Sequence, residues 1–299
     1  MVQHQGVEVI GLHVRHHVRC GGGSPAERAA RLGIELVTRD NSDVWGQSVL
    51  LPRFGYGREA NPCRDCRAGM LVLAREVAQA RAASFVVTGE ILGQRAWGQS
   101  RRDLDMLAYH SGLEGRLLRP LSALKLAPTD VELRGEIDRT LLGNLHGPGR
   151  SGLLKLARRL MPGALTEADR AGVREAGCEL SRRGSLQRVD QYKRWLASLP
   201  CQPAGSAAAR DLAIVLTGRL IELPGGLACV GRNERECARL EHLLAAGTEP
   251  AVPLRHVIRP AAGQRGPTAI VFGGLADARQ LLLQLDATGE KLELVTQPT

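Results

Sequence analysis

The 299-residue chain contains few aromatic side chains: Phe, Trp and Tyr together make up only 3 % of it. Its cores must therefore be built from Leu, Val, Ile and Ala, which the hydrophobic content of 43 % makes possible. No stretch approaches the ~20 consecutive apolar residues of a membrane-spanning helix, so we expect no membrane partner. The first residues show no basic segment followed by an apolar run, and we expect no signal peptide.

Closely spaced cysteines are also scarce. The seven cysteines are odd in number and only two lie near each other, which does not match a disulfide framework. The sequence thus predicts a protein of the reducing cytoplasm. Its length allows about two domains.

Acidic residues are outnumbered, with 31 Asp and Glu against 40 Lys and Arg and a net charge of +9. The excess is largest in residues 150–195, where eleven basic side chains stand against five acidic ones. An acidic polymer such as RNA is a natural partner for this segment, although an arginine-rich solvated surface is the alternative. The arginines that we expect to contact RNA are Arg158, Arg159, Arg182 and Arg183.

Strand-like and helical runs alternate over residues 1–128, which predicts βαβ units and a mainly parallel α/β sheet. A basic helical segment that ends in a linker at 200–206 is expected over 129–206, and a small α+β domain over 207–299. Strands are expected at residues 7–14, 34–38, 84–89, 116–121, 213–216, 227–230, 268–272 and 292–295. Helices are expected at residues 25–32, 66–82, 130–142, 151–160, 166–182, 186–197, 234–245 and 275–285.

The most informative motif is a Cys-x-x-Cys pair, Cys63 and Cys66, just before a long amphipathic helical run. A helix N-terminus favours the thiolate, which is both the nucleophile and the metal ligand. The pair therefore indicates sulfur transfer, redox exchange, or ligation of a metal or iron–sulfur cluster. Two inert buried thiols are the alternative, and the basic neighbours Arg58, Arg64 and Arg67 argue against it.

Two of these chemistries are less well supported by the surrounding sequence. A structural zinc site needs two further ligands, whereas Cys20, Cys178 and Cys201 are scattered single residues. A thioredoxin-type motif directly follows the first strand of its fold, and this pair does not.

Polar and glycine-rich segments follow two of the expected strands. Thr88-Gly89-Glu90 lies at the C-terminal end of the strand expected at 84–89, and Gly93-Gln94-Arg95 follows it. Ligands of open α/β sheets bind beyond the carboxyl ends of strands. An ordinary glycine turn is the alternative. Farther along, Gly231-Arg232-Asn233-Glu234 opens a helix and either binds an anion on its N–H groups or forms a turn with an N-cap.

Taken together, these motifs resemble the PP-loop ATP pyrophosphatase family, and within it the tRNA 2-thiouridylase branch. The resemblance rests on Tyr56-Gly57, residues 61–66, residues 88–95, Gln99 and residues 118–122. Residues 230–234 and 266–269 are similar to the small RNA-binding domain of NFACT-type ribosome-quality-control proteins.

The resemblance implies a Rossmann-like nucleotide-binding core and a chain that acts on tRNA. ATP, with Mg²⁺, adenylates a uridine carbonyl oxygen in that family, and a sulfur carrier then displaces AMP. By position, Cys63 or Cys66 would carry persulfide sulfur, taken from a donor protein or sulfide, or would ligate an iron–sulfur cluster with a third cysteine. The implied nucleotide-binding residues are Gly11, Leu12, Thr88, Gly89, Glu90 and Gln94, and the implied RNA contacts include Arg232 and Asn233. The sequence is also compatible with a homodimer.

The chain departs from the family pattern at two places. The Ser-Gly-Gly-x-Asp-Ser loop that cradles pyrophosphate would precede residue 6, and no Ser-Gly-Gly occurs in the sequence, so we expect a core without its first βα unit. The third cysteine of the relatives is also missing near residues 203–207, where Cys201 is the nearest substitute. The sequence therefore leaves two hypotheses: an ATP-dependent sulfurtransferase, or a homologue that binds RNA without catalysis.

Overall fold

The computed structural model describes residues 1–16, 24–160, 178–200, 206–245, 255–262, 264–286 and 292–296. Contacts within the chain divide it into two compact units. Unit 1 comprises Met1–Asn41, Arg53–Gly57 and Pro62–Gly177, and unit 2 comprises Ser42–Pro52, Arg58–Asn61 and Cys178–Thr299. Within the described part of the chain, no helix combines the length and apolar character needed to cross a membrane.

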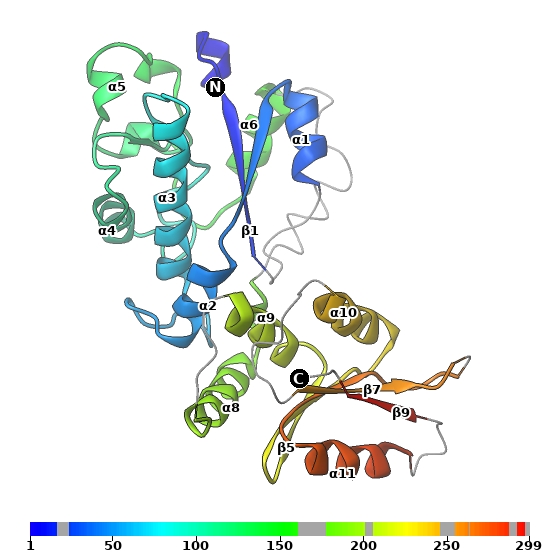
Figure 1. Cartoon of the computed structure of the whole chain (residues 1–299). Helices are drawn as coiled ribbons and strands as arrows, with labels where there is room; N and C mark the ends of the chain where they lie inside the picture. Colours follow the sequence, from blue (N-terminus) through cyan, green and yellow to red (C-terminus); the bar gives the residue numbers. More distant parts are fainter. Residues whose placement is uncertain are drawn as a thin grey trace. The chain divides into compact units, whose positions relative to one another are not determined.

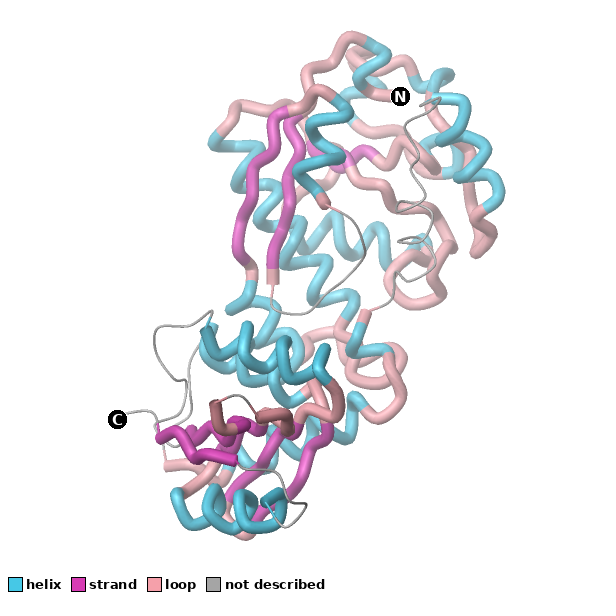
Figure 2. The backbone as a smooth tube through the Cα atoms, turned by 90° about the vertical axis from the view of Figure 1, so that its right-hand side faces the viewer, coloured by secondary structure: helices cyan, strands magenta, loops and turns pink. Residues whose placement is uncertain are grey.

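Unit 1 opens with a parallel pair of strands, β1 (Ile10–Arg15) and β2 (Glu35–Asp40), which run side by side (Figure 2). Helix α1 (Pro25–Leu32) connects them, as the sequence predicts. Its ends are set locally, because the Ser24 hydroxyl accepts the Glu27 N–H and Gly33 terminates the helix at φ +62°.

A second parallel pair, β3 (Val86–Val87) and β4 (Leu117–Leu118), forms its own two-stranded sheet. The expected buried strand over 84–89 is wrong in extent and burial, since only two residues pair and Val87 is 42 % exposed. The described residues thus show a mixed α/β unit with separate parallel pairs, and a Rossmann-like core stays a prediction.

Helices α3 (Cys63–Ala80) and α4 (Arg101–Ser111) pack against each other in unit 1 (Figure 1). Leu71, Leu107 and Leu113 form their shared core. The long helix expected over 130–142 is wrong, because the chain leaves the helix before Gly135, which adopts φ +73°. The other helices of unit 1 are η1 (Gln3–Gln5), η2 (Ala123–Lys125), α5 (Asp130–Leu133), η3 (Arg139–Leu141) and α6 (Ser151–Leu160).

Unit 2 contains an antiparallel sheet in the order β5-β6-β8-β7-β9. Figure 1 shows α11 on one of its faces, where Ala278 and Leu281 pack against the strands. The strands are β5 (Arg219–Leu223), β6 (Gly226–Val230), β7 (Arg255–Pro260), β8 (Ala269–Phe272) and β9 (Leu292–Thr296). The helices are α2 (Ser42–Leu50), η4 (Glu179–Ser181), α8 (Ser185–Ala197), α9 (Ser206–Val215), α10 (Glu234–Ala245) and α11 (Leu275–Asp286).

Part of unit 2 differs from what the sequence predicts. The strand expected at 213–216 is wrong, since those residues are largely the last turn of α9, and a short apolar run fits a buried helix as well as a strand. Strands β5 and β7 were not expected. Most of the helix expected at 166–182 and of the linker at 200–206 lies outside the described residues.

A buried ion pair joins α9 to the sheet of unit 2. The Asp211 carboxylate accepts from the Arg255 guanidinium and, at 3.4 Å, from the Tyr192 hydroxyl. Asp211 and Arg255 are 0 % and 4 % exposed. Burial raises the pKa of Asp211 to about 6, while the Arg255 and Arg210 charges oppose that rise. Loss of either partner would leave a charge buried without its counter-ion.

We expect Arg255→Met to lower the free energy of unfolding by about 3–5 kcal/mol at about pH 7.5. Since the folded pKa of Asp211 already exceeds its ordinary 3.8, protonation stabilises the fold at low pH, and this contribution is lost as the pH rises through about 6. Without Arg255 that pKa rises further, so the deficit should shrink at about pH 5. Urea unfolding at both pH values measures this.

Arg194→Met is the matched control, because Arg194 and Glu222 form a 3.4 Å pair with exposed side chains. It should change the free energy of unfolding by less than about 1 kcal/mol at either pH. Equal losses in the two variants would contradict the prediction.

Candidate functional site

Cys63 and Cys66 lie in the first turn of α3, three residues apart and therefore on one face of the helix. Both are half-buried thiols. Pro62, the N-cap residue, makes no side-chain hydrogen bond to the helix end, so the first turn keeps its partial positive charge. A Cβ built on Gly98 would lie 3.4 Å from the Cys63 sulfur, and Gly98 has φ +93°, so glycine is required against this thiol.

One turn farther along the same face, Arg67 forms an ion pair with the buried carboxylate of Glu90. The second carboxylate oxygen of Glu90 accepts from Arg119 Nε at 2.8 Å and from the Thr88 hydroxyl at 3.1 Å. Arg119 also donates to the Leu104 carbonyl. Glu90 thus connects α3, the segment after β3 and the segment after β4.

Arg64, on another side of the first turn, contacts two groups at once. Its Nε lies 2.7 Å from Asp103 Oδ1, and its Cζ lies 3.5 Å from the centroid of the Trp97 ring. Burial raises the pKa of Asp103, but hydrogen bonds from Ser100 and from the Gly98 N–H and the Arg64 charge outweigh it, so that pKa lies below its ordinary value. Asp103 therefore stays ionised and holds both Arg64 and the loop that carries Gly98.

Two buried polar atoms in this loop have no hydrogen-bond partner among the described residues: Trp97 Nε1 and Gln99 Oε1. Buried polar atoms are normally satisfied by protein or by ordered water. Because both atoms are enclosed by protein, ordered water is the usual partner for them.

The residues expected to bind nucleotide are only partly brought together. Thr88 and Glu90 belong to the cluster described above, and a Cβ built on Gly89 would meet no atom within 4 Å. Gly11 and Leu12 lie instead in the β1–β2 pair, where a Cβ on Gly11 would contact three neighbours at 3.3 Å. The backbone at Gly89 therefore borders open space, whereas Gly11 is enclosed by its neighbours. Gln94 is half-buried, and its backbone N–H donates to the Ile91 carbonyl.

A cluster or metal centre would need more ligands than this site shows. Among the described residues no group of three or more His, Cys, Asp or Glu side chains could hold a metal ion. Cys20 and Cys201 lie outside those residues. The two described thiols alone do not fit an iron–sulfur cluster, which takes four protein ligands.

The arginines expected to contact RNA are exposed but belong to different units. Arg158 and Arg159 form the last turn of α6 in unit 1. Arg182 and Arg183 lie between η4 and α8 in unit 2. Each pair must therefore be tested separately.

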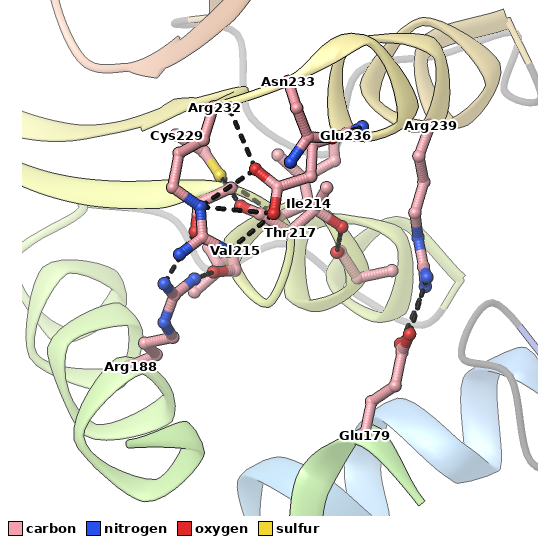
Figure 3. A network of polar contacts seen from close by, with 12 residues as sticks. Glu179, Arg188, Ile214, Val215, Thr217, Cys229, Arg232, Asn233, Glu236 and Arg239 are labelled. Carbon is pink, nitrogen blue, oxygen red and sulfur yellow. Dashed lines mark hydrogen bonds and ion pairs between the residues drawn. The ribbon is translucent and has the colours of Figure 1, made fainter. Parts of the chain in front are cut away.

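The segment 231–234 follows the N-cap alternative that its sequence left open (Figure 3). Asn233 Oδ1 accepts the Glu236 N–H at 3.0 Å, and the Glu236 carboxylate accepts the N–H of Arg232 at 2.9 Å and is paired with its guanidinium. The side-chain hydrogen bond from Arg232 holds the pKa of Glu236 below its ordinary value. The N-terminus of α10 is thus already occupied by the chain's own carboxylate.

Sequence reasoning missed the partners that hold the site in place. The role of Asp103 could have been predicted, because Ser100-x-x-Asp103 has the spacing of a capping box, and α4 forms this capping box. The pairing of Glu90 with Arg67 and Arg119 had no signal, because the three residues are distant in the sequence. Comparisons of the chain with models of protein families, with curated proteins and with solved structures find no match.

Cys229 should be inert to alkylation where Cys63 reacts. Cys229 is fully buried in β6, its thiol donates to the Thr217 and Ile214 carbonyls, and burial raises its pKa to about 12. We expect iodoacetamide at about pH 8 to modify Cys63 more than about a hundred-fold faster than Cys229. Peptide mass spectrometry measures both rates in one sample, and the urea-unfolded chain, in which both should react, is the control. Comparable rates in the folded chain would contradict this arrangement.

Proposed function

We propose that the chain carries sulfur on Cys63 for the thiolation of a base in tRNA. The observation that carries the proposal is the first turn of α3, which presents Cys63 and Cys66 at its N-terminal end and is connected through Arg67 to Glu90. Glu90 in turn follows Thr88 and Gly89, the backbone that leaves space for a bound group. One helix turn thus couples a sulfur site to a candidate nucleotide site.

The chemistry proposed for these residues balances in atoms and electrons. ATP supplies the activation of the uridine carbonyl oxygen, with loss of pyrophosphate. The terminal sulfur of a Cys63 persulfide attacks the activated carbon, and AMP leaves. The Cys66 thiolate then attacks the Cys63 sulfur, which leaves one sulfur on the base and a Cys63–Cys66 disulfide that a thiol reductant resets. Thr88, Gly89 and Gln94 would hold the nucleotide.

The test is sulfur loading of the purified chain. After exposure to polysulfide, we expect intact-protein and peptide mass spectrometry to show the gain of one sulfur atom at Cys63. Cys63→Ser should lose this gain and should also lose transfer of labelled sulfur to tRNA, because its hydroxyl cannot form a persulfide. Cys237→Ser, at another half-buried cysteine, is the matched control. Sulfur transfer retained by Cys63→Ser would overturn the proposal.

A second candidate function is RNA binding without catalysis. It is favoured by the exposed arginine pairs and by the filled surroundings of Gly11. A chain that binds tRNA but neither loads sulfur nor converts ATP to AMP would favour this candidate over the first.

We expect salt-sensitive tRNA binding that weakens when an arginine pair at the RNA surface is replaced by glutamine. Arg158→Gln with Arg159→Gln, and Arg182→Gln with Arg183→Gln, form two separate double variants. The pair in contact with phosphates should lower the slope of log affinity against log salt by roughly two, since about one counterion is released per phosphate contact. Fluorescence anisotropy over a salt series measures the slope. An unchanged slope in both variants would place RNA elsewhere.

A further inference from the structure

One aromatic cluster of unit 1 lies at the surface, in a chain with few aromatic residues. The nine Phe, Trp and Tyr side chains all lie within the described residues, and Tyr109, at 64 %, is the one classed as exposed. It does not stand alone, because the neighbouring His110 ring lies 5.2 Å away at 77°. An exposed aromatic in contact with further rings is a candidate recognition surface.

The cluster is completed by a second segment of the chain. The Phe54 ring lies 5.0 Å from the His110 ring, and Arg53 Cζ lies 5.3 Å from the Phe54 centroid. Phe54 and His110 are half-buried, while Arg53 and Tyr109 are exposed. Three ring systems and one guanidinium are thus in contact at one place, and we call these four residues the aromatic platform.

The platform is held rigidly from below. Asp65 Oδ1 accepts the Arg53 N–H at 2.7 Å, and Asp65 Oδ2 accepts the Phe54 N–H at 3.1 Å. Asp65 is 9 % exposed and sits in the first turn of α3, between the two cysteines in sequence. The other two platform residues, Tyr109 and His110, belong to α4, which packs against α3. The backbone of both halves is therefore anchored before any partner arrives, which lowers the entropic cost of binding.

We propose that the aromatic platform binds an unpaired base of single-stranded RNA by stacking. Aromatic rings and a guanidinium present the π faces and the positive charge that a base and its phosphate need, and stacking accepts any base. Asp105, exposed and one turn before Tyr109 on α4, disfavours a phosphate on its side, so the phosphate lies toward Arg53. The net charge of +9 supports the same class of partner.

The proposal deepens the proposed function, because it names where the RNA substrate is held. The turn that anchors the Phe54 loop through Asp65 is the turn that carries Cys63 and Cys66. A base stacked on the platform is therefore held by the same turn that presents the thiols. The identification of the ligand as RNA rests on the proposed function, whereas the capacity for stacking follows from the platform residues alone.

The test is binding of a short single-stranded RNA that contains one 2-aminopurine, whose fluorescence is quenched by stacking. We expect Tyr109→Ala to weaken binding by about five- to hundred-fold and to abolish the quenching, because an aromatic stack of this kind is lost. Phe54→Leu should do the same, and Arg53→Gln should mainly lower the salt dependence. Leu133→Ala and Arg134→Gln, exposed positions of the same unit, are the matched controls and should match the unsubstituted chain.

Tyr109 is exposed, so its replacement leaves the core intact, and circular dichroism of each variant checks the fold. Unchanged RNA affinity and quenching in a folded Tyr109→Ala variant would overturn the proposal and leave the rings to a protein partner. Equal loss in Tyr109→Ala and Leu133→Ala would overturn it as well. Sulfur loading at Cys63 requires no RNA, so failure of that experiment is distinguishable from failure of this one.

Discussion

The arrangement of unit 1 around the thiols depends on one buried carboxylate, that of Glu90. A charge out of contact with water has to be paired, and Glu90 is paired with Arg67 and Arg119 from two distant parts of the chain. The pairing holds the Arg67 side chain, one turn after Cys63 on α3, against the segment that follows β3. It also ties the segment after β3 to the segment after β4, although each strand contributes only two residues to their sheet.

Elements with local signals were predicted well from the sequence, and elements that depend on distant partners were not. Helices α1, α6 and α10 have the bounds expected, since caps, glycines and helical periodicity are written in neighbouring residues. The position of Cys63 and Cys66 at the start of a helix was likewise predictable. Three features could not be predicted: the last turn of α9, strands β5 and β7, and the partners of Glu90. Their burial and pairing are decided by residues far away in the sequence.

The helix N-termini of α10 and α3 differ in how the chain itself occupies them. At α10 the chain supplies its own carboxylate, Glu236, to the helix N-terminus and to Arg232. At α3 the N-cap residue, Pro62, adds no side-chain hydrogen bond, and the nearest acidic residue, Asp65, is engaged by the Arg53 and Phe54 backbone. The backbone N–H groups at the α3 terminus are therefore not capped by a side chain of the N-cap residue, in contrast to the terminus of α10.

Trp97 gives unit 1 an optical property of its own. Trp45 and Trp195 belong to unit 2, so Trp97 is the one tryptophan of unit 1. Its ring is covered by the Arg64 guanidinium at 3.5 Å and approaches the backbone of Gly57 so closely that no side chain would fit there. Because Arg64 lies next to Cys63 in the same turn, a movement of that turn changes the surroundings of a single indole. In a chain with Trp45 and Trp195 replaced by phenylalanine, its emission would report directly on the thiol-bearing turn.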